Sequence, residues 1–358
     1  MKRFRTFSVL MVVGLIGAAC NAGGGSSANE LSVIALPRDW CNYDGMLKGF
    51  AAKYPDIKIN EITPNAGSGD EVTAVKNSKG NTGAGAPDVI DVGVSFGPQA
   101  KTDGLLANYK VPTWDTIDPT TKDADGAWYG DYYGVLSFEV NTDIVKTVPK
   151  DWKDLLNPEY AHSVALAGDP LNSNQAIQTI EAASIANGGT VDDAQPGLAF
   201  FKQLETAGNF VHTVAKKAAL VKGEAPIIIT WSYLALADRD SLAGSTNVTV
   251  VIPATGRWGG LYAQGISAYA PHLANAKKWE DYLYSDEGQL NWLKGYCSTT
   301  RQADLIKNNK IPADLLAKLP DVTGAVFPTE AQLTAAKTLI QKSWSSVVGV
   351  GPLNTPPP

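Results

Sequence analysis

Apolar positions along the chain follow the periods of strands and helices in turn. Residues 31–35 form a short apolar run, residues 45–53 place apolar side chains at helical spacing, and residues 57–59 alternate as a strand does. Further strands are predicted at 88–92, 164–167, 223–230 and 248–252, and helices at 70–77, 99–102, 172–186, 196–206, 234–239, 274–284 and 287–294. This order predicts an α/β fold with a mostly parallel sheet.

Two longer strand patterns differ from the rest. In residues 128–143 (WYGDYYGVLSFEVNTD), polar aromatic side chains lead into the apolar run 135–138, which an acid, Glu139, then interrupts. A second long pattern, 261–269, follows a glycine-rich loop. We expect both strands to carry the chain between two lobes, with a solute bound between them.

The amino-terminal segment has the pattern of a bacterial secretory signal. Basic residues within the first five positions precede a short apolar run at 9–16, and small residues lead up to Cys20. This predicts a signal peptide over 1–19 and a flexible linker over 20–30, with Cys20 resembling the lipid-carrying cysteine of a lipoprotein. Cleavage without lipid attachment is the alternative. Such an anchor would hold the protein at the outer face of the cell membrane.

Length and charge limit the functional classes. A chain of 358 residues predicts about two domains, and 44% hydrophobic with 18% charged residues is typical of a globular protein. The formal net charge of −6, without a basic run, argues against a nucleic-acid partner. Cys41 and Cys297 are predicted either to form a disulfide or to lie unpaired in the core.

Four stretches resemble, in this order, segments of one class of transport proteins: PDVIDVGVSFGPQAKTDGLL, YYGVLSFEVNTD, VKGEAPIIITWSYLALA and ANAKKWEDYLYSDEGQ. The chain therefore resembles the extracellular solute-binding lipoprotein of an ABC importer, in the branch that binds polyamines, ferric iron, thiamine or aminophosphonates. The resemblance implies a two-lobe periplasmic-binding-protein fold of type II. Residues 31–138 with 262–358 would form lobe 1 and 139–261 lobe 2, and the C-terminal helices would lie on either lobe.

The same resemblance implies capture without catalysis or cofactor. The solute would bind between the lobes, the lobes would close, and the monomeric protein would dock on a membrane permease driven by an ATPase.

Ligands of open α/β sheets bind at the carboxyl ends of the strands. This rule and the crossing stretches select the candidate solute-binding residues Asp39, Trp40, Ser95, Phe96, Asp131, Tyr132, Tyr133, Glu139, Ser173, Asn174, Trp231, Tyr233, Trp258 and Tyr262. Trp231 matches the position at which the resembling polyamine binders stack a tryptophan on the ligand.

The nature of the solute stays open between three classes. Tryptophan stacking with acids such as Asp39, Asp131 and Glu139 favours an amine or polyamine-like cation. Helix N-termini at Ser95 and at 173–174 fit an anion such as a phosphonate or phosphate ester. Ferric iron held by tyrosinates is a third class, but the histidines lack the spacing of metal ligands.

An enzyme is the alternative from another class. Residues 93–97 match G-x-S-x-G, which predicts an α/β-hydrolase with Ser95 as nucleophile and His212 or His272 as base. No HGG-type oxyanion segment precedes the motif. We therefore expect a binding protein without catalytic residues.

Overall fold

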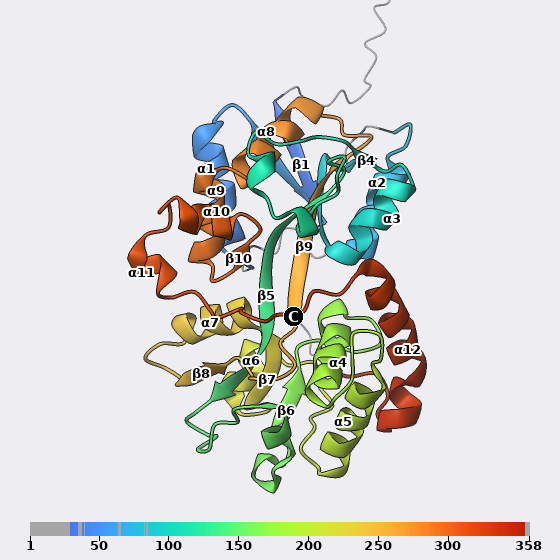
Figure 1. Ribbon diagram of the computed structural model, residues 1–358, viewed down its shortest axis with the longest axis vertical. Helices are drawn as coiled ribbons and strands as arrows, with labels where there is room; N and C mark the ends of the chain where they lie inside the picture. The colour runs from blue at the N-terminus through green and yellow to red at the C-terminus, as the bar shows by residue number, and fades with distance from the viewer. Residues whose placement is uncertain are drawn as a thin grey trace, which may run out of the picture.

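The structure is a computed structural model that describes residues 29–354 apart from 35–37, 39, 64–65, 82 and 84. The predicted signal peptide, Cys20 and Asp39 lie outside the described residues. Two α/β lobes lie one above the other along the long axis, and the strands β5 (Tyr129–Asn141) and β9 (Gly259–Ser267) run between them (Figure 1).

Lobe 1 is built on a parallel core of three strands, β2 (Lys58–Ile62), β1 (Glu30–Ile34) and β3 (Val89–Gly93). β9 runs antiparallel to β3, and the short strand β4 (Leu106–Ala107) pairs antiparallel with β9. Its helices are α1 (Tyr43–Lys53), α2 (Ser68–Asn77), α3 (Gly97–Thr102), α8 (Leu273–Leu283), α9 (Asp286–Lys294), α10 (Gln302–Lys307) and α11 (Ala313–Leu316), with the 3-10 turns η1 (Val94–Phe96), η2 (Trp114–Thr116) and η3 (Pro119–Thr121).

Lobe 2 is built around the C-terminal half of β5, which pairs with β7 (Ile227–Trp231) and β8 (Val248–Val251). β6 (Val164–Leu166) lies parallel to β7. Its helices are α4 (Asn174–Ala186), α5 (Gln195–Thr206), α6 (Lys217–Lys222), α7 (Ser232–Ser241) and α12 (Glu330–Val348), with the 3-10 turns η4 (Trp152–Leu156) and η5 (Pro158–Tyr160).

The sheet is continuous through both lobes in the order β2-β1-β3-β9-β5-β7-β6, with β10 (Ser298–Thr299) pairing to β5. The register of β5 against β9 shifts between Gly130 and Tyr133. Because neighbouring side chains of a strand point to opposite faces, Tyr132 and Tyr133 point to opposite sides of this hinge. Both predicted crossing strands are confirmed.

The long C-terminal helix α12 packs on lobe 2, one of the two placements that the sequence left open for the C-terminal helices. Its Trp344 is fully buried with its ring centroid 5.7 Å from that of Phe201 on α5. Gln341 Nε2 donates to the Leu171 carbonyl at 2.7 Å. The chain therefore crosses between the lobes a third time after α11, along β9, where Gly259 N donates to the Val326 carbonyl at 2.9 Å.

Cys41 and Cys297 form a disulfide with a Cα–Cα distance of 5.4 Å, which decides between the two predicted states. The bond ties the loop before α1 to the segment before β10, both within lobe 1. None of the helices in the described part of the chain is both long and apolar enough to traverse a lipid bilayer.

The predicted elements are confirmed to within a few residues, with one exception. The expected strand 223–230 begins only at Ile227, and the short helix α6 precedes it. Gly223 ends that helix with φ 73°, a left-handed conformation that glycine adopts without steric cost.

Candidate functional site

The main cleft lies between the lobes on the Tyr132 face of the hinge and has a volume of about 870 Å3. Lobe 1 contributes the start of α2 and the end of β3, lobe 2 contributes the loop into α4, and β5 and β9 contribute Tyr132 and Tyr262. This volume is within the range of small-molecule sites, which measure about 300–1,000 Å3.

At one end of the cleft, two helix N-termini from opposite lobes approach each other. Ser68 is the first residue of α2 and accepts a hydrogen bond from Gly93 N at 3.0 Å. A Cβ on Gly93 would lie 3.3 Å from Asn174 Nδ2, at the start of α4, and 3.8 Å from Ser68 Oγ. The missing side chain of Gly93 therefore lets both N-termini face the same space. First-turn amides and the helix dipole favour an anion there.

The deeper part of the cleft carries carboxyl groups. Glu71 and Asp91 line it, and both are nearly fully buried. Tyr43 donates through its hydroxyl to Asp91 Oδ2 at 2.6 Å, and Asp91 N donates to Glu71 Oε2 at 2.9 Å. Behind them, Gln264 Nε2 donates to Asp131 Oδ2 at 2.9 Å. Asp91 Oδ1 has no hydrogen-bond partner among the described residues.

Burial governs the protonation of these acids. It raises the pKa of Glu71 well above the usual value, and the charge of Asp91 raises this pKa further. The pKa of Asp91 is also raised, first by burial and then by the Asp131 charge, and burial raises the pKa of Asp131 to about 7. A charged form of any of them costs desolvation energy that a bound hydrogen-bond donor or cation would offset.

Aromatic rings form one wall of the cleft. The Trp40 ring lies 5.6 Å from Tyr262 in an edge-on arrangement and 5.8 Å from Tyr233. Tyr132 and Tyr262 are stacked with a centroid distance of 5.2 Å. Rings held by one another in this way offer a rigid surface to a flat or apolar part of a solute.

Two amines also line the cleft. Lys216 Nζ donates to the Ala167 carbonyl at 2.9 Å, and burial lowers the pKa of this lysine. Lys337 on α12 has its Nζ 5.9 Å from the centre of the Phe96 ring. The cleft thus combines cationic groups and helix N-termini with buried carboxyl groups.

The structure brings seven predicted residues to the cleft wall: Trp40, Ser95, Phe96, Tyr132, Ser173, Asn174 and Tyr262. Asp131 and Tyr233 are fully buried directly behind that wall and contact its members. Tyr133 faces the other side of the hinge.

Three predicted site residues are core residues and are corrected. Trp231 is 1% exposed, and its ring covers Gly260, where an added Cβ would lie 2.4 Å from Trp231 Cη2. Trp258 is fully buried and donates through Nε1 to Gln178 Oε1 at 2.9 Å. Glu139 lies between β7 and β8, where burial raises its pKa to about 8. Packing of the hinge strands requires the volume of both tryptophans, so neither reaches the solute space.

Sequence reasoning missed Ser68, Glu71, Asp91 and Lys216, all of which line the cleft. A signal existed for two of them. Ser68 follows Gly67 at the start of a predicted helix, and Asp91 interrupts an apolar strand as Glu139 does. The positions of Glu71 and Lys216 depend on tertiary packing.

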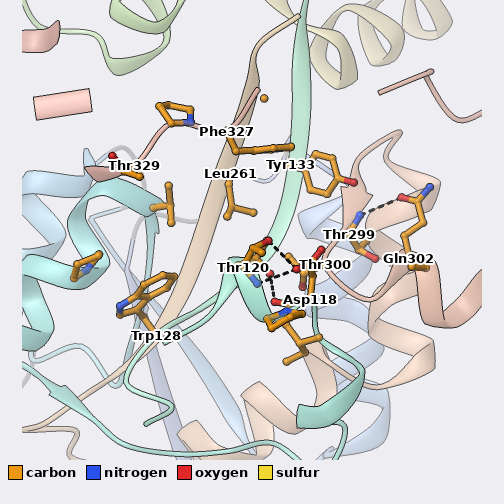
Figure 2. Close-up of a pocket in the computed structure, with 18 of the residues that line it drawn as sticks. Asp118, Thr120, Trp128, Tyr133, Leu261, Thr299, Thr300, Gln302, Phe327 and Thr329 are labelled. Carbon is orange, nitrogen blue, oxygen red and sulfur yellow. Dashed lines mark hydrogen bonds between the residues drawn. The ribbon is translucent and has the colours of Figure 1, made fainter. Parts of the chain in front are cut away.

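A second cavity of about 790 Å3, here called the rear cavity, lies on the opposite face of the hinge. Figure 2 shows Tyr133, Leu261 and Phe327 on one side and Trp128, Thr120 and Asp118 on the other. Its walls come from β5, β9, the third crossing segment and the η2–η3 loop.

The arrangement required for a serine hydrolase is not assembled at Ser95. His272 Nδ1 pairs with Asp88 Oδ2 at 2.7 Å at the start of β3, whereas Ser95 follows the end of that strand. His212 Nε2 is 2.7 Å from Glu205 Oε2 on the outside of lobe 2. Neither candidate base is placed to activate the serine.

Comparisons with known proteins agree with this geometry. A family model described as bacterial extracellular solute-binding protein matches residues 84–321, more than half of the chain. An uncharacterised protein of Haemophilus influenzae is 27% identical over 308 residues, which cover 82% of this chain and 84% of that one.

Solved structures share the fold. The periplasmic binding protein AfuA of Actinobacillus pleuropneumoniae, with fructose-6-phosphate bound, superimposes with a TM-score of 0.66 at 23% identity over 90% of this chain and 98% of that one. The spermidine/putrescine-binding protein PotD of Streptococcus pneumoniae gives a TM-score of 0.63 at 15% identity over 87% and 99%. The chain belongs to the family of bacterial extracellular solute-binding proteins.

Proposed function

We propose that this protein captures a small anionic solute of the phosphate-ester or phosphonate class and delivers it to a membrane permease. The observation that carries the proposal is the approach of the α2 and α4 N-termini from opposite lobes at Gly93. An anion placed there accepts hydrogen bonds from both lobes at once. The anion therefore gains its full binding energy only when the lobes are closed, so binding stabilises the closed state. A permease has to distinguish this closed state from the open one.

The remainder of the solute would occupy the aromatic and acidic part of the cleft. Asp91 Oδ1, without a partner among the described residues, accepts a hydrogen bond from a hydroxyl or amine group. Trp40 and Tyr262 provide apolar surface beside it. A phosphorylated sugar or an aminophosphonate carries both chemical ends, and AfuA, which shares the fold, was solved with fructose-6-phosphate.

An amine or polyamine cation is the second candidate. Glu71, Asp91 and Asp131 lie within one buried cluster, in which the charge of Asp131 raises the pKa of Asp91 and the charge of Asp91 raises the pKa of Glu71. A bound cation would relieve that repulsion. PotD, a spermidine/putrescine-binding protein, shares the same fold. The two Lys side chains in the cleft and the helix N-termini favour the anion.

The test is native mass spectrometry of the protein as purified, followed by calorimetry. The titration panel contains fructose 6-phosphate, glucose 6-phosphate, 2-aminoethylphosphonate, inorganic phosphate, putrescine and spermidine. Micromolar binding by a phosphorylated or phosphonate compound, with no heat from putrescine or spermidine, is expected. Saturable binding of a polyamine alone would assign the cleft to the second candidate.

We further propose that Cys20 carries the lipid that holds the protein at the membrane. The small residues before it and the glycine- and serine-rich stretch after it support this. Expression of full-length protein with Cys20→Ser is expected to move it from the membrane fraction to the soluble fraction. Equal membrane association of both forms would contradict the anchor.

A further inference from the structure

We propose that the rear cavity is a second small-molecule site and that it binds a neutral, polyhydroxylated ring such as a mono- or disaccharide. The cavity lies on the other side of β5 and β9 from the solute cleft, because Tyr133 and Leu261 face it while Tyr132 and Tyr262 face the cleft; Leu333 of α12 is the one lining residue that the two share. This site is independent of the solute class proposed above.

An aromatic platform is already in place at the mouth of this cavity. Phe327 is 44% exposed, and its ring packs edge-on against Tyr133 with a centroid distance of 5.1 Å. Gly259 has no side chain that would displace this ring, since an added Cβ would lie 2.3 Å from Phe327 Cε1. The neighbouring Val326 is held by both of its backbone groups, since its N donates to the Arg257 carbonyl just before β9 and its carbonyl accepts from Gly259 N, each at 2.9 Å. An exposed ring held in this way is ready to pack against the apolar face of a ligand.

Hydroxyl and amide groups surround the platform. Thr299 is 2% exposed, and its Oγ1 has no hydrogen-bond partner among the described residues. Gln302, Thr120 and Thr300 line the same space, as Figure 2 shows. A buried hydroxyl without a partner is unfavourable. Oγ1 itself is enclosed, so a ligand hydroxyl in the cavity would satisfy it after rotation of the Thr299 side chain.

The charges of the lining residues decide the class of ligand. Asp118 and Asp115 line the cavity, and no Lys, Arg or His is among the lining residues. A phosphate or carboxylate is therefore disfavoured. Both acids are exposed at the rim, so a cation inside the cavity would lose water without gaining a buried counter-charge. A neutral ring with apolar faces and hydroxyl edges matches the walls.

Saturation-transfer difference NMR tests the site on the full mature protein. Glucose, galactose, maltose and sucrose are the probes, each at millimolar concentration. At least one is expected to receive saturation from the wild-type protein. Phe327→Ala and Thr299→Val are each expected to weaken that binding by about tenfold. Phe96→Ala, which alters the solute cleft, is expected to leave it unchanged.

Circular dichroism melting checks that each variant is folded. Both are expected to fold, because Phe327 is exposed and the Thr299→Val substitution preserves the shape of the side chain. The proposal is overturned if none of the four saccharides receives saturation. It is also overturned if Phe96→Ala abolishes the signal while Phe327→Ala leaves it intact, because the saccharide would then occupy the solute cleft.

Discussion

Tyr132 on β5 and Tyr262 on β9 lie stacked, with ring centroids 5.2 Å apart and an interplanar angle of 12°. The two residues come from strands that cross the hinge in opposite directions, and both line the solute cleft. The floor of the cleft is therefore part of the hinge. Side chains that contact the solute there also change position when the two lobes move relative to each other.

Replacing Tyr262 tests this floor. Tyr262→Ala is expected to weaken binding of the solute found by native mass spectrometry by about tenfold or more, since a ring buried at a contact contributes about 1.4 kcal/mol or more. Tyr262→Phe keeps the stacked ring and is expected to lose far less. Isothermal titration calorimetry measures both. Tyr269→Ala, outside the cleft, serves as control; equal affinity in Tyr262→Ala and this control would remove Tyr262 from the site.

Asn174 tests the approach of the two helix N-termini. Asn174→Leu removes an amide that faces Gly93 across the lobes and keeps the side-chain volume. Binding of the phosphate or phosphonate end is expected to fall by about tenfold, the loss of about one charge-assisted hydrogen bond. The exposed Asn308→Leu is the control. Calorimetry with solutes that differ only in the phosphoryl group checks the result, and a similar loss for the dephosphorylated solute would argue against an anion subsite.

The disulfide is expected to contribute to stability and to hold the site. Cys41 and Cys297 are 256 residues apart, and cross-links of long loops stabilise proteins by about 2–5 kcal/mol. The double variant Cys41→Ala/Cys297→Ala should therefore unfold at a clearly lower denaturant concentration.

Trp40, which lines the cleft, directly precedes Cys41 in the chain. Loss of the disulfide is therefore expected to displace Trp40 and to lower solute affinity as well. Urea titration and calorimetry with and without a reducing agent measure both effects. A wild-type protein that shows two reactive thiols before reduction would contradict the pairing.

The raised pKa of Glu139 predicts that the free energy of unfolding depends on pH. Burial disfavours the charged carboxylate and raises the pKa of Glu139 in the folded protein to about 8, above its ordinary value of 4.5. The folded state therefore binds more protons than the unfolded state between these values, and the free energy of unfolding falls as the pH rises from about 5 to 8. Asp131, with a pKa of about 7, acts in the same direction.

Glu139→Gln removes this titration while keeping the shape. We expect the variant to melt close to wild type at pH 5 and to be more stable at pH 8, by about 1.4 kcal/mol or more, the value of one pKa unit. Differential scanning fluorimetry across this range measures the difference. Parallel melting curves for the two proteins would show that Glu139 does not titrate there.

Gly260 tests the core position of Trp231. An added methyl group at residue 260 would lie 2.4 Å from the indole ring, so Gly260→Ala is expected to cost about 1–3 kcal/mol through overpacking. Gly351→Ala is the matched control, since an added Cβ there meets no atom within 4 Å. Chemical denaturation separates them, and equal midpoints would mean that Trp231 is not packed against β9.

The local pattern of the sequence determined the elements and their order. The short apolar strand in 88–92, the helical spacing in 274–284 and the long crossing strands are local patterns that nearby residues specify. The resemblance of four ordered stretches to binding lipoproteins indicated the fold and the family, and both are confirmed.

Tertiary structure alone decided which aromatic and acidic side chains reach the solute. Trp231 and Tyr262 look equally suitable in sequence, yet Trp231 on β7 fills the space that Gly260 leaves on β9, two strands away in the sheet, and Tyr262 lines the cleft. Burial raises the pKa of Asp91, and the charge of Asp131 raises it further; Asp131 is 40 residues away in sequence and lies on β5, on the far side of β9. Packing between distant segments sets exposure and electrostatics, and no local pattern encodes these neighbours.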